Sequence, residues 1–179
     1  SIGSSAFSGC SGLTSVTIPN MVTSIGEKAF SFCDGLTTIT FNAVNCTYMA
    51  RPFMGCSNQA TLTIGENVTC IPQYAFREFY GLTSVTIPNT VTNIGTFAFY
   101  DCSALTSVNY TGTVAQWCNI LFNDYYSNPI RYSHSLNING SLISSLVIPD
   151  SVTSISNYAF YYCNSITEIH SETGVAPLL

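Results

Sequence analysis

Cysteine is the residue whose number and spacing first suggest chemistry in this sequence, because thiolates attack electrophiles, bind metals and form disulfides. Five of the eight cysteines occupy one slot of a recurring pattern: Cys10, Cys33, Cys56, Cys102 and Cys163. Stacked repeats lie about 4.8 Å apart, so bridges between neighbouring cysteines are geometrically permitted. We expect buried free thiols instead, because Phe79 and Tyr125 fill the same slot and mark it as an apolar core position.

The other residues that often carry chemistry are scattered along the chain. Cys46, Cys70 and Cys118 lie in other slots, and the sequence holds no Cys-x-x-Cys pair and no Cys/His cluster with zinc spacing. Neither His134 nor His170 lies in a recognisable catalytic motif, and no glycine-rich phosphate loop or calcium motif is present. We therefore expect no enzymatic activity, with no catalytic, cofactor-binding or metal-binding residue.

The 179-residue chain is poor in charged residues. Only 7% of its residues are Asp, Glu, Lys or Arg and 46% are hydrophobic, a balance that excludes intrinsic disorder. The four basic residues against nine acidic ones give a net charge of −5, so nucleic acid is not an expected partner. No apolar run approaches the roughly 20 residues of a membrane span, so we expect no membrane insertion.

A fixed period organises the sequence. Phenylalanine recurs every 23 residues and then once after a step of 38, which exceeds 23 by 15: Phe7, Phe30, Phe53, Phe76, Phe99, Phe122 and Phe160. The strand-like segment that begins at Leu13 repeats with the same steps. The sequence therefore predicts about seven units, one of which carries an insertion of 15 residues.

Each unit contains one strand signal of the form Leu-x-x-Val-x-Ile, in which the first, fourth and sixth side chains point inward. Pro19, Pro88 and Pro149 end this strand in three of the units. A second apolar pair and an Ala-Phe pair follow, which indicates a short return segment. Such a coil buries its apolar side only against copies of itself, so the units must stack into a solenoid.

The pattern of residue types at 113–142 predicts an irregular insertion that consists of a helix and a hairpin. Thr113 and Gln116 form the pattern of a helix capping box, and we expect Trp117, on the apolar face of that helix, in the core. The register suggests that the helix replaces the ordinary return segment. Asn-Gly at 139–140 predicts a tight hairpin that returns the chain to register. The insertion either alters a binding surface or is simply an irregular repeat.

Several residue types hold their register across most of the chain. Leu-Thr-Ser-Val-Thr-Ile-Pro-Asn stands at 13–20 and 82–89, and Ala-Phe-x-x-Cys stands at 6–10, 29–33, 98–102 and 159–163. These motifs resemble the bacterial BspA-like type of leucine-rich repeat. The resemblance implies a leucine-rich repeat solenoid, a right-handed curved array of about seven 23-residue units with a concave parallel β-sheet. It implies that residues 1–179 form a single domain, which we expect to be a fragment of a longer protein.

BspA-like proteins are typically cell-surface or secreted proteins of anaerobic bacteria and of some mucosal protists, and several act as adhesins. By this resemblance we expect a non-enzymatic, adhesin-like binding module, on the cell surface or secreted, that recognises a host extracellular protein or glycan. The alternative is a structural spacer that projects another domain. The repeats fit both functions, because a fold alone does not determine function.

Two surfaces are candidates for binding, and the first is the outward face of the sheet. Its neutral side chains can hydrogen-bond to a protein or glycan with little electrostatic steering. They are Thr14, Thr17, Thr37, Thr40, Thr63, Thr83, Thr86, Thr106 and Asn109. A simpler interpretation is structural, because threonine is a good strand former and stacked threonines suit a parallel sheet.

The second candidate surface is an aromatic stripe around the Ala-Phe motif in the C-terminal half of the chain. It comprises Tyr74, Phe97, Tyr100, Tyr158, Tyr161 and Tyr162. Early units carry serine or lysine at the equivalent positions. Exposed aromatic side chains are common in binding surfaces, but here they equally serve to cover the inserted segment, and both alternatives remain open.

The first unit lacks the atypical residues that usually cover the end of a repeat array. Leu13, Val16 and Ile18 match the core positions of interior units, so we expect further repeats or another domain before Ser1 in the intact protein. Because an uncovered edge invites pairing with another copy, we expect weak self-association of this chain through its N-terminal end.

Overall fold

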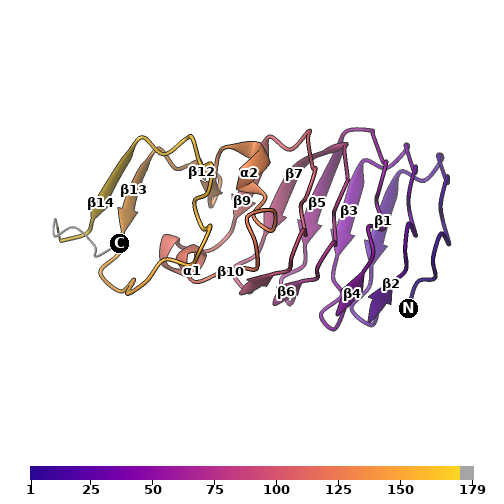
Figure 1. Ribbon diagram of the computed structural model, residues 1–179, viewed down its shortest axis with the longest axis horizontal. Helices are drawn as coiled ribbons and strands as arrows, with labels where there is room; N and C mark the ends of the chain where they lie inside the picture. Colours follow the sequence, from indigo (N-terminus) through magenta and orange to yellow (C-terminus); the bar gives the residue numbers. More distant parts are fainter. Residues whose placement is uncertain (174–179) are drawn as a thin grey trace.

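The computed structural model describes residues 1–173, so residues 174–179 of the predicted domain lie outside the described part. The chain forms a parallel β-solenoid of about seven turns (Figure 1). Strand residues pair at intervals of 23, as Ser15 pairs with Thr38 and Thr38 with Thr61. The predicted leucine-rich repeat solenoid is confirmed. The right-handed turn and the curvature that the resemblance implies stay predictions.

The main sheet has seven strands in the spatial order β1-β3-β5-β7-β9-β11-β12. They are β1 (Ser15–Ile18), β3 (Thr38–Phe41), β5 (Ala60–Ile64), β7 (Leu82–Ile87), β9 (Ser107–Tyr110), β11 (Asn137–Ile138) and β12 (Ser141–Leu142). Short return strands form two smaller sheets, β2-β4 and β6-β8-β10. They are β2 (Ser24–Ile25), β4 (Tyr48–Met49), β6 (Cys70–Ile71), β8 (Asn93–Ile94) and β10 (Leu121–Phe122). The remaining elements are β13 (Ser145–Ile148), β14 (Glu168–Ser171), α1 (Val114–Cys118) and α2 (Ile130–Ser133).

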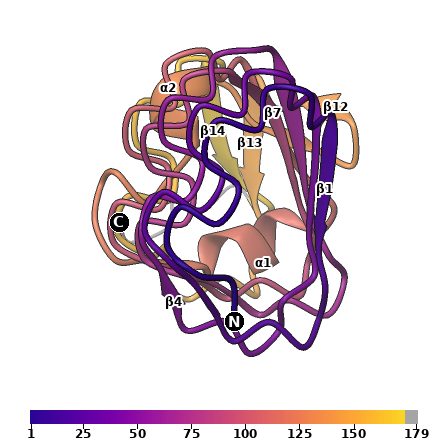
Figure 2. The ribbon, with the colours of Figure 1, turned by 90° about the vertical axis from the view of Figure 1, so that its right-hand side faces the viewer.

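Each regular coil has a sheet side and a return side. Figure 2 looks along the solenoid and shows β1 and β7 on one side and the returning chain on the other. In β3, Ile39 and Phe41 are buried and the alternate residues are partly or fully exposed, as the strand signal predicts. Pro19, Pro88 and Pro149 directly follow β1, β7 and β13. These prolines end the strands because they have no N–H to donate to the ladder.

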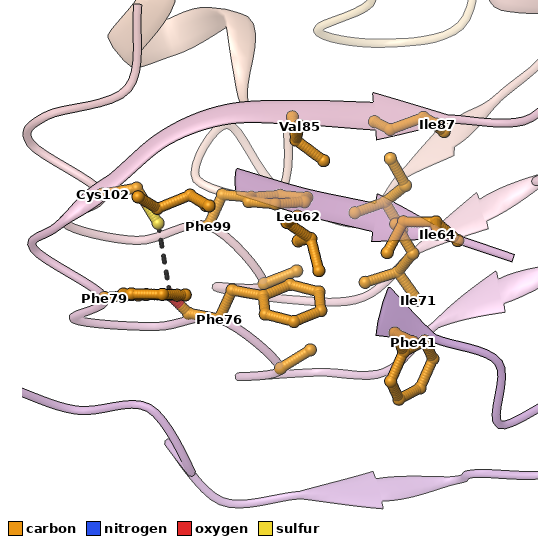
Figure 3. Close-up of a cluster of buried hydrophobic side chains, with 14 of the residues drawn as sticks. Phe41, Leu62, Ile64, Ile71, Phe76, Phe79, Val85, Ile87, Phe99 and Cys102 are labelled. Atoms are coloured by element: carbon orange, nitrogen blue, oxygen red, sulfur yellow. Dashed lines mark hydrogen bonds between the residues drawn. The ribbon is translucent and has the colours of Figure 1, made fainter. Parts of the chain in front are cut away.

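A column of stacked phenylalanine rings fills the space between the two sides. The ring centroids of Phe7, Phe30, Phe53, Phe76 and Phe99 follow one another at 5.2, 5.3, 6.0 and 5.5 Å. Figure 3 shows Phe76 and Phe99 packed beside aliphatic side chains of the sheet. The core is therefore one continuous stack, which no single coil could form alone.

The phenylalanine column ends at Phe99, and the prediction that Phe122 continues it is wrong. Phe122 lies in β10 and pairs with Ile94 of β8, 28 residues earlier. This spacing of 28 residues exceeds the 23-residue period by 5, which is the length of α1. The helix therefore lies before the return strand, whereas the sequence suggested that it replaces that strand. The chain beside Phe99 belongs to Tyr126, whose carbonyl accepts a hydrogen bond from the Phe99 N–H at 3.3 Å.

The capping box that begins α1 is confirmed. Thr113 Oγ1 accepts a hydrogen bond from the Gln116 N–H at 3.2 Å, and Gln116 Oε1 accepts one from the Thr113 N–H at 2.9 Å. Trp117 is fully buried, as expected, and its Nε1–H donates to the carbonyl of Ala159 at 2.9 Å. One side chain thus joins the inserted helix to a coil 42 residues further along the chain.

The predicted hairpin is present, but it does not return the chain to the register of the main sheet. β11 and β12 are antiparallel, and Asn139 and Gly140 have φ values of 50° and 79°, as a tight Asn-Gly turn requires. β11 occupies the place beside β9, with Asn137 opposite Asn109. Because that edge is taken, β13 and β14 form a separate two-stranded sheet beyond the hairpin (Figure 1).

The recurring cysteine slot lies in the core in four of its five occurrences. All eight cysteines are free thiols, and the buried members of the slot are Cys33, Cys56, Cys102 and Cys163. Cys10 is exposed, so its predicted burial is wrong, because no coil within residues 1–173 covers its outer side. Tyr125 is also exposed, since the residues added by α1 shift the insertion out of the repeat register.

Candidate functional site

The first threonine column of the sheet face joins neighbouring coils. Its hydroxyls donate to main-chain carbonyls of the preceding coil: Thr37 to Thr14 at 3.1 Å, Thr83 to Ala60 at 2.9 Å and Thr106 to Thr83 at 3.3 Å. These hydrogen bonds favour the structural interpretation of this column, because the hydroxyls already have partners within the solenoid.

The second threonine column leaves its side chains accessible. Thr17, Thr40, Thr63 and Thr86 are aligned across β1, β3, β5 and β7, and each is exposed or half-buried. The next aligned residue, Asn109, accepts a hydrogen bond from the Gly140 N–H at 3.0 Å through its side-chain oxygen. The hairpin therefore limits this part of the candidate surface to the four threonines.

A polar groove lies where β1, β3 and β5 end. Its volume is about 570 Å³, and its lining includes Thr17, Asn20, Asn42, Glu66 and Asn67. These amides and this carboxylate can hydrogen-bond to a polar ligand. No aromatic residue lines the groove, so it lacks the apolar contact area that dominates most binding surfaces.

The aromatic stripe forms a continuous surface on the return side, which we call the aromatic ridge. Its members are Tyr74, Phe97, Tyr100, Tyr125, Tyr126, Tyr158, Tyr161 and Tyr162. The ring centroids of Tyr74 and Phe97 are 5.8 Å apart, and those of Phe97 and Tyr126 are 5.4 Å apart. Tyr125 then links Tyr126 at 4.1 Å with Tyr158 at 6.2 Å. The structure thus brings together all the aromatic residues proposed from the sequence.

Two ridge tyrosines were missed by the sequence analysis. Tyr125 and Tyr126 come from the insertion and connect the aromatic residues before it with those after it. The repeat period placed Tyr125 in the cysteine slot, whereas the residues added by α1 move it to the surface. The available signal was the turn-rich composition of residues 123–129, because turns lie at the surface and expose their side chains.

Two arginines lie among the rings of the ridge. The guanidinium carbon of Arg77 is 4.9 Å from the ring centroid of Tyr100 and 5.6 Å from that of Phe97. The guanidinium carbon of Arg131, on α2, lies between 4.7 and 6.0 Å from five ring centroids, those of Tyr125, Tyr126, Tyr132, Tyr161 and Tyr162. Cation–π attraction helps to hold these side chains in fixed positions.

Several ridge residues have a strained backbone. Tyr74, Phe97 and Tyr158 have φ values of 57°, 55° and 65°, in the left-handed region that costs a non-glycine residue roughly 1–2 kcal/mol. Lys28 and Arg51, at the same position in earlier coils, are left-handed as well, so the turn of the solenoid imposes this conformation. Bulky residues are rare in this conformation.

An ion-pair cluster borders the ridge on the side of the earlier coils. Arg51 lies 3.0 Å from a carboxylate oxygen of Glu27 and 3.8 Å from one of Glu78. Arg77 Nε lies 2.9 Å from Glu78, and Lys28 Nζ lies 3.9 Å from Glu27. Each basic residue of this cluster, including the ridge residue Arg77, therefore has a carboxylate partner.

Within residues 1–173, no three histidine, cysteine, aspartate or glutamate side chains lie close enough together to hold a metal ion. His170 lies 3.3 Å from Glu168 on the exposed strand β14, and His134 Nδ1 lies 3.4 Å from the carbonyl oxygen of Tyr162. No helix in the described part of the chain is both long and apolar enough to cross a membrane. Of the surfaces described above, the aromatic ridge is the one whose side chains contact one another over several coils.

The coil geometry and the motifs agree with a known repeat family. The sequence profile of the BspA type leucine rich repeat region matches residues 1–128 and 135–177, in 6 copies. The chain belongs to the BspA-type leucine-rich repeat family. In this BspA-type chain the gap between the two matched ranges, 129–134, contains α2 and therefore Arg131. Arg131, unlike the other ridge arginine, Arg77, therefore lies outside the ranges that match the family.

Two solved structures are similar to this BspA-type chain. A leucine rich cell surface protein from Faecalibacterium prausnitzii A2-165 is 27% identical, with 60% of this chain and 35% of that chain covered and a TM-score of 0.43. A leucine rich repeat protein from T. pallidum is 22% identical, with 96% of this chain and 63% of that chain covered and a TM-score of 0.38. The chain spans about a third of the first protein and less than two thirds of the second. No curated protein matches the sequence.

Proposed function

We propose that this chain is a non-enzymatic binding module of a cell-surface or secreted protein and recognises an extracellular host protein or glycan through the aromatic ridge. Membership of the BspA-type family supports the proposal, and the continuous ridge is the observation that carries it. Tyrosine and arginine dominate the binding energy of many interfaces, because they combine large apolar area with polar tips. Tyr158 and Tyr162 are 41% and 53% exposed, so their rings are accessible to a partner.

The ridge is a better candidate than the sheet face. Hydroxyls of the first threonine column are already bonded to the solenoid, as Thr83 is to the Ala60 carbonyl. Ridge tyrosines, in contrast, keep exposed area while ring contacts and Arg131 hold them in place. Because these side chains are already ordered, little conformational entropy is lost when a partner binds.

A structural spacer is the second candidate function. The column of stacked rings from Phe7 to Phe99 favours it, since a continuous core makes a regular solenoid that can hold another domain at a distance. A spacer, however, has no need of a continuous surface of aromatic side chains, such as the one that joins Phe97 to Tyr158 through the tyrosines of the insertion. This difference favours binding.

An array of matrix proteins and mucosal glycans, probed with the wild-type chain and with Tyr162→Asn, tests the proposal. Asparagine tolerates the left-handed conformation, so the substitution removes the ring without adding backbone strain. Phe32→Asn is the matched control, because Phe32 is also left-handed, at φ 54°, and is also 53% exposed. Phe32 lies in the second coil, outside the ridge.

The proposal predicts specific binding by the wild-type chain that Tyr162→Asn weakens and Phe32→Asn does not. Circular dichroism melts should show that both variants remain folded. If the wild-type chain binds nothing on the array, the chain is better described as a spacer. If both variants weaken binding equally, the contact surface is not the ridge.

A further inference from the structure

Arg131 differs from the other basic residues of the chain in having no carboxylate partner. Lys28, Arg51 and Arg77 each lie within 4 Å of Glu27 or Glu78. No acidic side chain of residues 1–173 forms an ion pair with Arg131, which is only partly exposed to solvent. Its partners within the described chain are tyrosine side chains, whose rings and hydroxyls attract a cation more weakly than a carboxylate does.

The segment that carries Arg131 is held rigidly against the coils. The Asn128 side-chain N–H groups donate to the carbonyls of Tyr158 at 2.8 Å and Ala159 at 3.0 Å, and its side-chain oxygen accepts the Ile130 N–H at 3.0 Å. Asn128 is fully buried, so these bonds are shielded from water. The buried amide therefore fixes the start of α2 beside the coil that supplies the last ridge tyrosines.

A second anchor lies on the other side of Arg131. The hydroxyl of Tyr132 accepts a hydrogen bond from the Asp101 N–H at 2.7 Å, which ties α2 to an earlier coil. The nearby carboxylate of Asp124 accepts from the Tyr126 N–H at 3.0 Å and from Ser127 Oγ at 2.7 Å. Asp124 thus serves to order the insertion, and the guanidinium group of Arg131 is positioned before any partner binds.

We infer that Arg131 is the charge anchor of the aromatic ridge and pairs with an aspartate or glutamate side chain of a polypeptide partner. This inference rests on the proposed function and names the chemistry of the partner. A guanidinium group binds a carboxylate through two parallel N–H···O bonds. The surrounding tyrosines would contact the residues that flank the acidic side chain. A polypeptide is favoured over a glycan because clustered tyrosine and arginine are characteristic of protein interfaces.

Selection of a displayed library of random 12-residue peptides on the immobilised 179-residue chain tests this inference. Enriched peptides are then measured by fluorescence anisotropy against wild type, Arg131→Gln and Arg131→Lys. Lys28→Gln is the control, because it removes the same charge in the second coil, two coils before the first ridge residue, Tyr74, and Lys28 has its own carboxylate partner, Glu27. Thermal melts establish that each variant is folded, and Arg131→Lys keeps the positive charge if Arg131→Gln is unstable.

Enriched peptides should share an aspartate or glutamate, and Arg131→Gln should weaken their binding by about tenfold or more. Arg131→Lys should weaken it less, and Lys28→Gln should have no effect. Replacing the shared acidic residue of the peptide by its amide should abolish the difference between wild type and Arg131→Gln.

Three outcomes would overturn the inference. Enrichment of peptides without acidic residues, still lost in Tyr162→Asn, would leave the proposed function intact and remove the role of Arg131. Equal weakening of acidic and amide peptides by Arg131→Gln would show that Arg131 only positions the rings. Binding of sialylated but not neutral glycans, with no peptide enriched, would assign the anchor to an acidic sugar. Absence of any ridge-dependent ligand would instead count against the proposed function itself.

Discussion

The thiol of Cys102 donates a hydrogen bond to the carbonyl oxygen of Phe76, 26 residues earlier, at 3.2 Å (Figure 3). The same bond recurs from Cys56 to Phe30 at 3.1 Å and from Cys33 to Phe7 at 3.0 Å. The recurring cysteine is therefore a link between neighbouring coils. Its small apolar side chain fits the core, and its S–H donates to a carbonyl that also accepts a turn N–H, as the Phe76 carbonyl accepts from Phe79 at 3.3 Å.

The thiols should divide into reactive and protected groups in the native protein. Cys10 and Cys70 are exposed and should react with a disulfide reagent in native buffer, Cys70 more slowly because desolvation raises the pKa of its thiol, whereas the buried Cys33, Cys56 and Cys102 should react only after denaturation. Titration with and without guanidinium chloride measures the two groups. Rapid reaction of most thiols in native buffer, or a mass loss indicating bridges, would contradict the assignment.

Burial raises the pKa of the Cys56 thiol to about 12, and this shift predicts a loss of stability at high pH. The thiol of an unfolded chain titrates near pH 9. The thiol holds its proton more tightly in the folded state than in the unfolded state. The thiol therefore stabilises the fold fully below pH 9, and this stabilisation is lost as the pH rises toward 12. The free energy of unfolding, measured with urea, should be lower at pH 10.5 than at pH 8. This decrease should be smaller for Cys56→Ala.

Phe76→Ala should lower the free energy of unfolding by about 3–5 kcal/mol. Phe76 is fully buried, and its ring contacts Phe53, Phe99 and Phe41 at centroid distances of 6.0, 5.5 and 6.0 Å. The truncation leaves a cavity in the middle of the ring column. Urea denaturation is the measurement, and Met21→Ala, at a residue 82% exposed, should change the midpoint little. Equal midpoints for the two variants would mean that the column is not the core.

Gly81→Ala should destabilise the solenoid by about 1–3 kcal/mol, whereas Gly12→Ala should be tolerated. A Cβ on Gly81 would collide with the Asn58 carbonyl of the preceding coil. The Gly81 backbone cannot easily move away, since it bonds to Cys56 and Ala60 at 2.9 Å each. Gly12 occupies the same slot in the first coil and has no atom within 4 Å of the added carbon. Thermal melts of the two variants compare them directly, and similar melting temperatures would refute the close approach.

Tyr110→Phe should raise the stability by about 1–3 kcal/mol, because it removes a buried hydroxyl that lacks a partner. The Tyr110 hydroxyl has no hydrogen-bond partner within residues 1–173, and burial raises its pKa to about 12. Tyr132→Phe is the matched control and should be destabilising, since the Tyr132 hydroxyl accepts the Asp101 N–H at 2.7 Å. Urea unfolding of both variants at pH 7 is the measurement. A loss of stability in Tyr110→Phe would indicate that the hydroxyl is hydrogen-bonded in solution.

The regular part of the fold could be predicted from the sequence because every coil presents the same environments. The inward phenylalanine at Phe30 and at Phe76 meets the same neighbours one coil away, so the period alone identifies the column. The insertion could not be predicted in this way. Phe122 and Tyr125 fall on the period by coincidence, because α1 adds residues before β10 and the following turn absorbs the shift.

In the candidate site, too, the residues of the regular coils could be predicted from the sequence and those of the insertion could not. Ridge residues such as Tyr74 and Phe97 share a slot, so the sequence identifies them as neighbours. The position of Arg131 depends instead on the bonds of Asn128 to a coil 30 residues later in the chain. No local pattern contains that contact, and the continuity of the ridge therefore required the structure.

The first coil presents an apolar groove and an unpaired strand edge. β1 is the edge strand of the main sheet. The groove has a volume of about 340 Å³ and is lined by Ile2, Phe7, Leu13, Val16, Thr17, Ile18, Pro19, Val22 and Phe30. Phe7 is 45% exposed, although its counterpart Phe30 is buried. Strand edges and apolar surface of this kind pair readily with another copy, so we expect this chain to self-associate weakly.

Val16→Lys should suppress that self-association, because a charged side chain on the edge strand opposes pairing and its aliphatic stem can still lie along the groove. Met21→Lys is the control, since it makes the same change in charge at a residue that is 82% exposed and outside the groove. Light scattering over a concentration series should show an apparent mass that rises for wild type and Met21→Lys but stays constant for Val16→Lys. A wild-type chain that remains monomeric at the highest concentration, or a rise that Val16→Lys leaves unchanged, would show that the first coil does not mediate association.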